Sequence, residues 1–415
     1  MVALLSATAT ASYLCRVNVS VAGVLMMRDL GLSQQAMGRV FSAFLVGYAL
    51  CQIPGGMLAD RFGAARVLGW AALAWVAATG WIVGAGPSVI MLLAARCALG
   101  VAEAPTFPAA AQAISRLLPA AQRGRANGMV VAAVGLGSAI APPLMWFAMV
   151  RWGWRVALMV SSLPALALGC AWMSIRQPAV LPPESTTGGI PAAAPPAPPQ
   201  RRNFILLTMS YSLQGYVGYI FVFWFYLYLV DVRHFDLLRG ALFSSVPWLL
   251  SIVSIPLGGW LFDRLPCDRR TIPIAGLAGS GLFIALGAHT QHPYLAAVCM
   301  AFATALVLSV EGPFWATMTV VAGARSGTGG GIMNMGCNIG GMISPALTPV
   351  LAASIGWEAA LMVSAALAVV AALLWYGIRP PAGNPSFGSS RTAPLGKQPV
   401  EVEDAHLLDA DAGNV

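Results

Sequence analysis

Apolar stretches of about 20 residues recur along the chain and alternate with short segments that carry most of the charged residues. An apolar helix of that length spans the hydrocarbon core of a bilayer, so the pattern predicts transmembrane helices. We expect twelve helices, and therefore an all-α membrane protein. Their predicted ranges are 3–26, 36–58, 67–86, 89–112, 126–148, 156–175, 204–230, 240–262, 271–289, 293–320, 328–351 and 358–377.

Composition agrees with a protein embedded in a lipid bilayer. Of the 415 residues, 58% are hydrophobic and 9% are charged, whereas a soluble domain has about 25% charged residues. The net charge of +8 does not indicate nucleic-acid binding, because the basic residues lie between the apolar runs and form no stripe. The seven cysteines show no spacing typical of a metal site or a disulfide framework, and we expect no metal and no cofactor.

The two halves of the chain resemble each other in sequence. PGGMLADR at 54–61 recurs as LGGWLFDR at 257–264, and GWRVALMVS at 153–161 recurs as GWEAALMVS at 356–364. Matches in the same order indicate parallel duplication of a six-helix unit. We therefore expect two pseudo-symmetric six-helix bundles, with a binding site where they meet near the middle of the membrane.

Basic residues predict the orientation of the chain. If both termini are cytoplasmic, the inner loops and tail hold fifteen Lys and Arg residues and the outer loops hold six. This bias predicts a cell (inner) membrane protein with both ends inside. The first apolar run lacks a basic region before it, so we expect it to be retained as a helix. The expected parts are an N-terminal bundle (1–176), a Pro/Ala-rich cytoplasmic linker (177–203), a C-terminal bundle (204–378) and a disordered cytoplasmic tail (379–415).

Arg16, Arg96 and Glu103 are charged residues set within long apolar runs of predicted helices. An ionised side chain at mid-bilayer costs roughly 3 kcal/mol, so such residues usually face a bundle interior or a pathway. Arg96 and Glu103 lie two turns apart on one helix face, and both can point inward. The planar guanidinium of Arg16 matches the geometry of a carboxylate. Structural roles stay open, with Arg96 as a partner of Glu103 and several polar residues as bonds between helices.

The segment GMLADRFGAAR at 56–66 joins the second and third predicted helices. It resembles the Gly-x-x-x-Asp-Arg-x-Gly signature of the major facilitator superfamily. The resemblance implies an alternating-access fold of twelve helices, in which this loop forms charge-assisted bonds in one conformation and loses them in another. The residues that it implicates as a conformational gate are Gly56, Asp60, Arg61, Gly63, Arg66, Asp263 and Arg264.

A narrower resemblance covers nearly the whole chain except linker and tail. Segments 13–22, 47–56, 96–108, 123–128, 311–315 and 331–341 are similar to the anion:cation symporter family, which includes bacterial sugar-acid, hexuronate and galactonate transporters. The resemblance implies that Arg16 binds a substrate carboxylate, that Tyr48 positions it and that Glu103 takes part in proton coupling. Further candidates are Tyr13, Gln52, Gln214, Asn334 and Asn338 for substrate, and Arg96 and Glu311 for coupling.

The function implied is import of a small organic anion, such as a hexonate or hexuronate, by proton symport. We expect Glu103 to load and release a proton as its distance from Arg96 changes. No nucleotide-binding motif is present, so we expect neither ATP drive nor enzymatic activity, and we expect a monomer.

One position departs from the family pattern. Family members proposed to couple through two carboxylates carry an Asp directly before the first-helix Arg, and this chain has Cys15 there. A buried thiol cannot replace the missing charge. An uncoupled or exchanging carrier is therefore an alternative, and a transport-inactive anion sensor is a second one.

Overall fold

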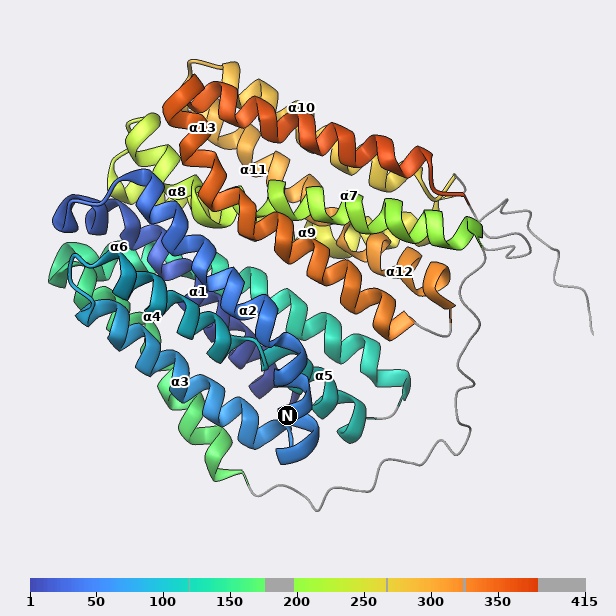
Figure 1. Cartoon of the computed structure of the whole chain (residues 1–415), viewed down its shortest axis with the longest axis horizontal. Coiled ribbons are helices and arrows are strands. Elements are labelled where there is room, and N and C mark those ends of the chain that lie inside the picture. The colour runs from blue at the N-terminus through green and yellow to red at the C-terminus, as the bar shows by residue number, and fades with distance from the viewer. Residues whose placement is uncertain (119, 176–197, 266–267, 324–325, 380–415) are drawn as a thin grey trace, which may run out of the picture.

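The computed structural model describes residues 1–118, 120–175, 198–265, 268–323 and 326–379 (Figure 1). These residues form helices and no strand, which confirms the expected fold class. The helices are α1 (Val2–Leu30), α2 (Gln34–Phe62), α3 (Ala64–Gly84), α4 (Val89–Glu103), α5 (Thr106–Leu117), α6 (Ala120–Ser174), α7 (Pro198–Phe223), α8 (Phe225–Leu227), the π-helix η1 (Tyr228–Val232), α9 (Leu237–Arg264), α10 (Thr271–His289), α11 (Pro293–Ser309), α12 (Glu311–Ala322) and α13 (Ser326–Tyr376).

Two long helices, α6 and α13, each contain two of the predicted membrane crossings, and a single glycine separates the two crossings in each helix. Gly153 in α6 has φ 76° and Gly356 in α13 has φ 87°, so each long helix bends into two at these residues. L-residues with a side chain rarely adopt such a φ, which explains why both copies of the repeat carry glycine here. Within the described residues, ten helical spans are long and apolar enough to cross a membrane. Because two of the ten contain these bends, twelve crossing segments result.

Two predicted helices are interrupted beside their acidic residues. The expected helix 89–112 divides into α4, which ends at Glu103, and α5, whose first cap is Pro105. The expected helix 293–320 divides into α11 and α12, which begins at Glu311. Proline cannot donate a backbone hydrogen bond and crowds the preceding turn, so Pro105 and Pro313 favour these breaks. Each interrupted pair still forms one candidate membrane span, Val89–Leu117 and Pro293–Ala322, so the two predicted crossings are present and only their continuity as single helices was wrong.

The chain forms two helical bundles that lie side by side, α1–α6 and α7–α13 (Figure 1). Residues 198–203, expected in the linker, belong to α7, because that helix already begins at Pro198. The remainder of the expected linker and nearly all of the expected tail lie outside the described residues.

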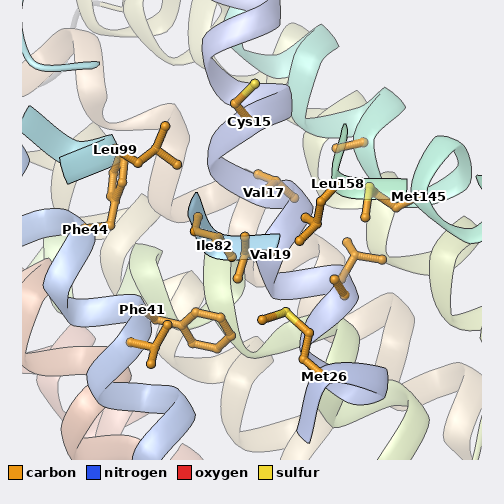
Figure 2. Close-up of a cluster of buried hydrophobic side chains, with 14 of the residues drawn as sticks. Cys15, Val17, Val19, Met26, Phe41, Phe44, Ile82, Leu99, Met145 and Leu158 are labelled. Atoms are coloured by element: carbon orange, nitrogen blue, oxygen red, sulfur yellow. The ribbon is translucent and has the colours of Figure 1, made fainter. Parts of the chain in front are cut away.

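Helix α1 is the central helix of the first bundle. Cys15, Val17 and Val19 of α1 pack against apolar residues of α2, α4 and α6, including Phe44 and Leu99 (Figure 2). Burial of this helix on all sides places its few polar residues in the interior of the bundle.

The two bundles make close contact along the Gln34 end of α2. The ring of Phe41 stacks on Phe223 with 5.2 Å between centroids, and the Ser42 hydroxyl donates to the Met342 carbonyl at 2.7 Å. Toward the other end of the same helix, Leu50 and Ile53 are 69% and 70% exposed. Helix α2 is therefore more buried at its Gln34 end than around Leu50 and Ile53.

Two glycines allow α2 and α4 to cross closely. A Cβ atom added to Gly47 would collide with the carbonyl oxygen of Cys97, and one added to Gly100 would collide with that of Phe44. Small residues at a helix crossing let backbones approach in this way. The crossing sets Phe44 and its neighbours on α2 directly against the charged residues of α4.

We expect Gly100→Ala to destabilise the protein by about 1–3 kcal/mol, because the added methyl group forces α2 and α4 apart. The measurement is the midpoint of thermal unfolding of the purified protein in detergent. Gly80→Ala in α3 is the matched control, since a Cβ there meets no atom within 4 Å. Equal midpoints for the two variants would contradict the close crossing.

Candidate functional site

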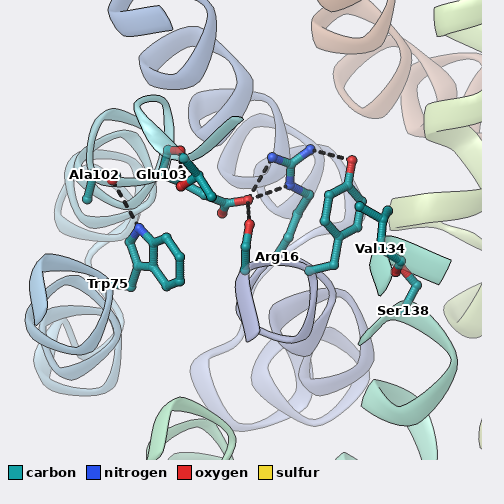
Figure 3. Close-up of polar contacts among 9 residues, drawn as sticks. Arg16, Trp75, Ala102, Glu103, Val134 and Ser138 are labelled. Atoms are coloured by element: carbon teal, nitrogen blue, oxygen red, sulfur yellow. Dashed lines mark hydrogen bonds and ion pairs between the residues drawn. The ribbon is translucent and has the colours of Figure 1, made fainter. Parts of the chain in front are cut away.

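A buried ion pair joins the first and fourth helices (Figure 3). Both side chains are almost completely inaccessible, with Arg16 1% and Glu103 0% exposed. The Glu103 Oε1 atom accepts from Arg16 Nη2 at 2.7 Å and from Arg16 Nε at 3.0 Å. The Ser12 hydroxyl, one turn before Arg16 on α1, donates to the same oxygen at 2.5 Å. The pair is thus held from one side by α1 and from the other by the end of α4.

The two oxygens of the Glu103 carboxyl group have different surroundings. Oε1 accepts three hydrogen bonds, whereas Oε2 is buried and has no hydrogen-bond partner among the described residues. A carboxylate has acceptor capacity on both oxygens, and a protonated carboxyl group places its hydrogen on one of them. The unpaired Oε2 is therefore the oxygen that can take up a proton without breaking an existing bond.

Aromatic rings surround the guanidinium of Arg16. Its Cζ atom lies 4.3 Å from the ring centroid of Tyr13, 4.6 Å from that of Tyr48 and 4.9 Å from that of Phe44. The Tyr13 hydroxyl also accepts a hydrogen bond from Arg16 Nη1 at 3.1 Å. Cation–π contacts in such desolvated positions are each worth about 2 kcal/mol. Tyr13 and Tyr48, both candidates from sequence, therefore lie at Arg16, while Phe44 was not among the candidates.

The expected pairing of Glu103 with Arg96 is corrected by the structure. Glu103 bonds to Arg16, whereas Nε, Nη1 and Nη2 of Arg96 have no hydrogen-bond partner among the described residues, although the side chain is 0% exposed. Both α4 residues do face the interior, as expected. Seven residues along a helix correspond to a rise of about 10 Å, so the two side chains lie at different depths. Helix α1 passes Glu103 at the depth where Arg16 can reach it.

Two candidates for substrate binding link the two bundles. The Asn334 amide on α13 donates to Gln52 Oε1 on α2 at 3.0 Å. The Asn338 amide donates to the Asn334 carbonyl, also at 3.0 Å. These three side chains form a polar strip across the interface between the halves.

The remaining candidates in the second bundle gather around Glu311. The Tyr211 hydroxyl and the Trp315 indole donate to Glu311 Oε1, the latter at 3.3 Å, and Gln214 donates to Oε2 at 3.4 Å. This carboxyl group has donors from α7 and α12 but no ion pair among the described residues. Tyr211 and Trp315 were not among the candidates, although each lies at helical spacing from one, three residues before Gln214 and four after Glu311.

The signature loop makes its bonds within the first bundle. Asp60 accepts from the Gln112 amide of α5 at 2.5 Å and lies 3.9 Å from Arg116. Gly63, with φ 85°, forms the turn between α2 and α3. Three other gate candidates lie in the loop. At Gly56 an added Cβ atom would lie 3.6 Å from Pro108. Arg61 lies over the Phe62 ring, and Arg66 is exposed. In the second bundle Asp263 is exposed and Arg264 lies over the Trp260 ring.

The chain belongs to the Major Facilitator Superfamily, whose family model matches residues 5–345 and 319–407. It is 34% identical over 393 residues to a protein of Cupriavidus necator named "Probable sulfoacetate transporter SauU", covering 89% of this chain and 91% of that one. It is 25% identical to a hexuronate transporter of Bacillus subtilis and 26% identical to a D-galactonate transporter of Escherichia coli. The alignments cover 90% and 88% of this chain, and 93% and 92% of those proteins.

Solved structures show the same fold. A bacterial homologue of the human lysosomal transporter Spinster, in an inward-facing and occupied conformation, superposes with a TM-score of 0.77 at 17% identity. That match covers 92% of this chain and 98% of the other. A D-xylose–proton symporter gives 0.75 at 16% identity, covering 91% and 98%. The chain is therefore a membrane transporter by fold and family.

We expect Glu103→Leu to lower the free energy of unfolding by about 3–5 kcal/mol, because it leaves the Arg16 charge buried without its partner. Replacing both members, as Arg16→Met with Glu103→Leu, should restore most of that loss, since apolar residues of similar volume pack without a charge. Thermal unfolding of the single and double variants in detergent measures both effects. A double variant as unstable as the single one would contradict the ion pair as the cause.

Proposed function

We propose that this protein imports a small organic anion together with protons, by alternating access between the two bundles. The observation that carries the proposal is the buried pair of Arg16 and Glu103, because one guanidinium can serve either the internal carboxylate or that of a substrate. The relatives named as sulfoacetate, hexuronate and D-galactonate transporters support an organic anion as the substrate class. Within that class we propose a sugar acid or a carboxylate of comparable size.

Coupling follows from competition for Arg16. An ionised Glu103 is bonded to the Nε and Nη2 atoms of Arg16. A substrate carboxylate must therefore displace the negatively charged Glu103 side chain before it can bind there. Protonation at the free Oε2 atom removes that charge and weakens the bonds to Oε1. The substrate carboxylate can then take the guanidinium in a bidentate geometry. Anion and proton therefore favour each other's binding, which is the thermodynamic condition for symport.

Alternating access requires the contacts between the bundles to separate. At the Gln34 end of α2 these are the stacking of Phe41 on Phe223 and the Ser42 bond to Met342. Nearer the other end, the Gln52–Asn334 bond links the bundles. We propose that these two sets of contacts open in alternation, that both termini are cytoplasmic and that the transporter is a monomer. Tyr13 and Tyr48 would line the site, with Gln214, Asn334 and Asn338 supplying hydrogen bonds from the second bundle.

We expect Glu103→Gln to abolish proton-driven accumulation, because an amide cannot exchange a proton with either side. Exchange of labelled for unlabelled anion should persist, since the amide resembles the protonated carboxyl group and leaves Arg16 free. Uptake and exchange by proteoliposomes, with and without an imposed pH gradient, measure the two activities separately. Accumulation by the variant would sink the assignment of Glu103.

The wild-type protein in the same proteoliposomes separates the alternatives. A symporter responds to an inward proton gradient with faster and higher uptake. An uncoupled or exchanging carrier, suggested by Cys15, transports the anion but is indifferent to the gradient. An anion sensor binds the anion and shows no exchange at all.

A further inference from the structure

The buried charges of the first bundle do not balance. Among the described residues, Arg16, Arg96 and Glu103 are the charged side chains that are less than 2% exposed. Two cations and one anion leave a net positive charge in a region from which water is excluded. Protonation of Glu103 raises that imbalance to two positive charges.

Arg96 carries the excess charge. All three of its side-chain nitrogen atoms lack a hydrogen-bond partner among the described residues, and its Cζ atom lies 5.0 Å from the centroid of the Phe44 ring. A cation–π contact of about 2 kcal/mol does not offset the several kcal/mol that an unpaired buried ion costs. The Glu103 carboxylate and, more weakly, the Cys15 thiol interact with Arg96 electrostatically, but neither accepts a hydrogen bond from it, and the thiol is directed at the Ser161 carbonyl, with a sulfur–oxygen distance of 3.9 Å. The donors of Arg96 thus make no hydrogen bond to any acceptor among the described residues and are available to a bound anion.

The two arginines are arranged around one aromatic ring. The Cζ atom of Arg16 lies 4.9 Å from the Phe44 centroid, and that of Arg96 lies 5.0 Å from it. A small molecule with an anionic group at each end can therefore bind both guanidinium groups once the Phe44 side chain moves from between them and the ligand. A molecule with one anionic group satisfies only one of them.

We propose that Arg96 forms a second anionic subsite, so that the transporter selects small dianions over monoanions of the same size. The inference rests on the proposed function, because Arg16 holds the first anionic group. With Glu103 protonated, two guanidinium charges match the two charges of the ligand. With a monoanion, Arg96 stays unpaired and the cost of its burial is not recovered.

The test compares ligands that differ in one charged group. Dissociation constants are measured with the purified full-length protein, by thermal stabilisation, for D-glucarate against D-gluconate and for sulfoacetate against its carboxamide, 2-sulfoacetamide. We expect the dianion of at least one pair to bind at least about tenfold more tightly. Equal affinities within both pairs would overturn the second subsite and leave the proposed function standing. Failure of all four ligands to bind would overturn both.

Two variants locate the effect at Arg96. Arg96→Gln should collapse the dianion-to-monoanion ratio toward one, and Arg96→Lys should retain part of it. Cys15→Asp leaves Arg96 in place but introduces a carboxylate at a position that interacts electrostatically with it, so it should remove the preference as well. Cys15→Ser is the matched control and should keep the wild-type ratio. Size-exclusion profiles verify that each variant is folded, and an unchanged ratio in both Arg96→Gln and Cys15→Asp would overturn the proposal.

Discussion

A charge in a region without water is costly unless it is paired, and the pairing of Arg16 with Glu103 meets this constraint for two of the three buried charges among the described residues of the first bundle. Several features of the bundle serve that pairing. Helix α1 is buried on all sides and brings the Ser12 hydroxyl to the same carboxyl oxygen. Helix α4 ends at Glu103, which places the carboxyl group at a helix break rather than within a continuous wall. The glycine crossing of α2 and α4 then brings the aromatic rings of α2 over the guanidinium.

The sequence predicts the scaffold well because hydrophobicity and repeats are local or regular signals. Twelve apolar segments, the duplicated motifs and the buried positions of Arg16, Arg96 and Glu103 are all readable from spacing. The partner of Glu103 was not, because helical periodicity gives the face of a residue but not the depth at which a neighbouring helix passes it. The same limit explains the Gln52–Asn334 bond, which joins residues far apart in the sequence and depends on how the bundles meet. Phe44 was missed because an aromatic residue in an apolar run has no distinguishing pattern.

The two bundles share their scaffold and differ in their chemistry. Gly153 and Gly356 occupy corresponding bends with similar backbone angles, and the duplicated Asp-Arg motif ends α2 and α9. The charged pair, however, lies in the first bundle, while Glu311 of the second is held by neutral donors from Tyr211, Gln214 and Trp315. Duplication thus supplied a symmetric framework in which each half has its own carboxyl environment. Because the carboxyl sites differ between the halves, the residues that bind ligand in one half can change while the helix packing shared by both halves is kept.

The hydrogen bond between Gln52 and Asn334 also affects the rate at which the two bundles separate. It connects the bundles through two uncharged amides, and a neutral hydrogen bond contributes about 1 kcal/mol net. If this bond must break before the bundles separate, it slows their separation by about fivefold, because 1.4 kcal/mol corresponds to a factor of ten in rate and the bond contributes about 1 kcal/mol. An ion pair at the same place would be harder to break and would hold the molecule longer in one state. The amides at this contact therefore add less to the barrier for separating the bundles than an ion pair there would.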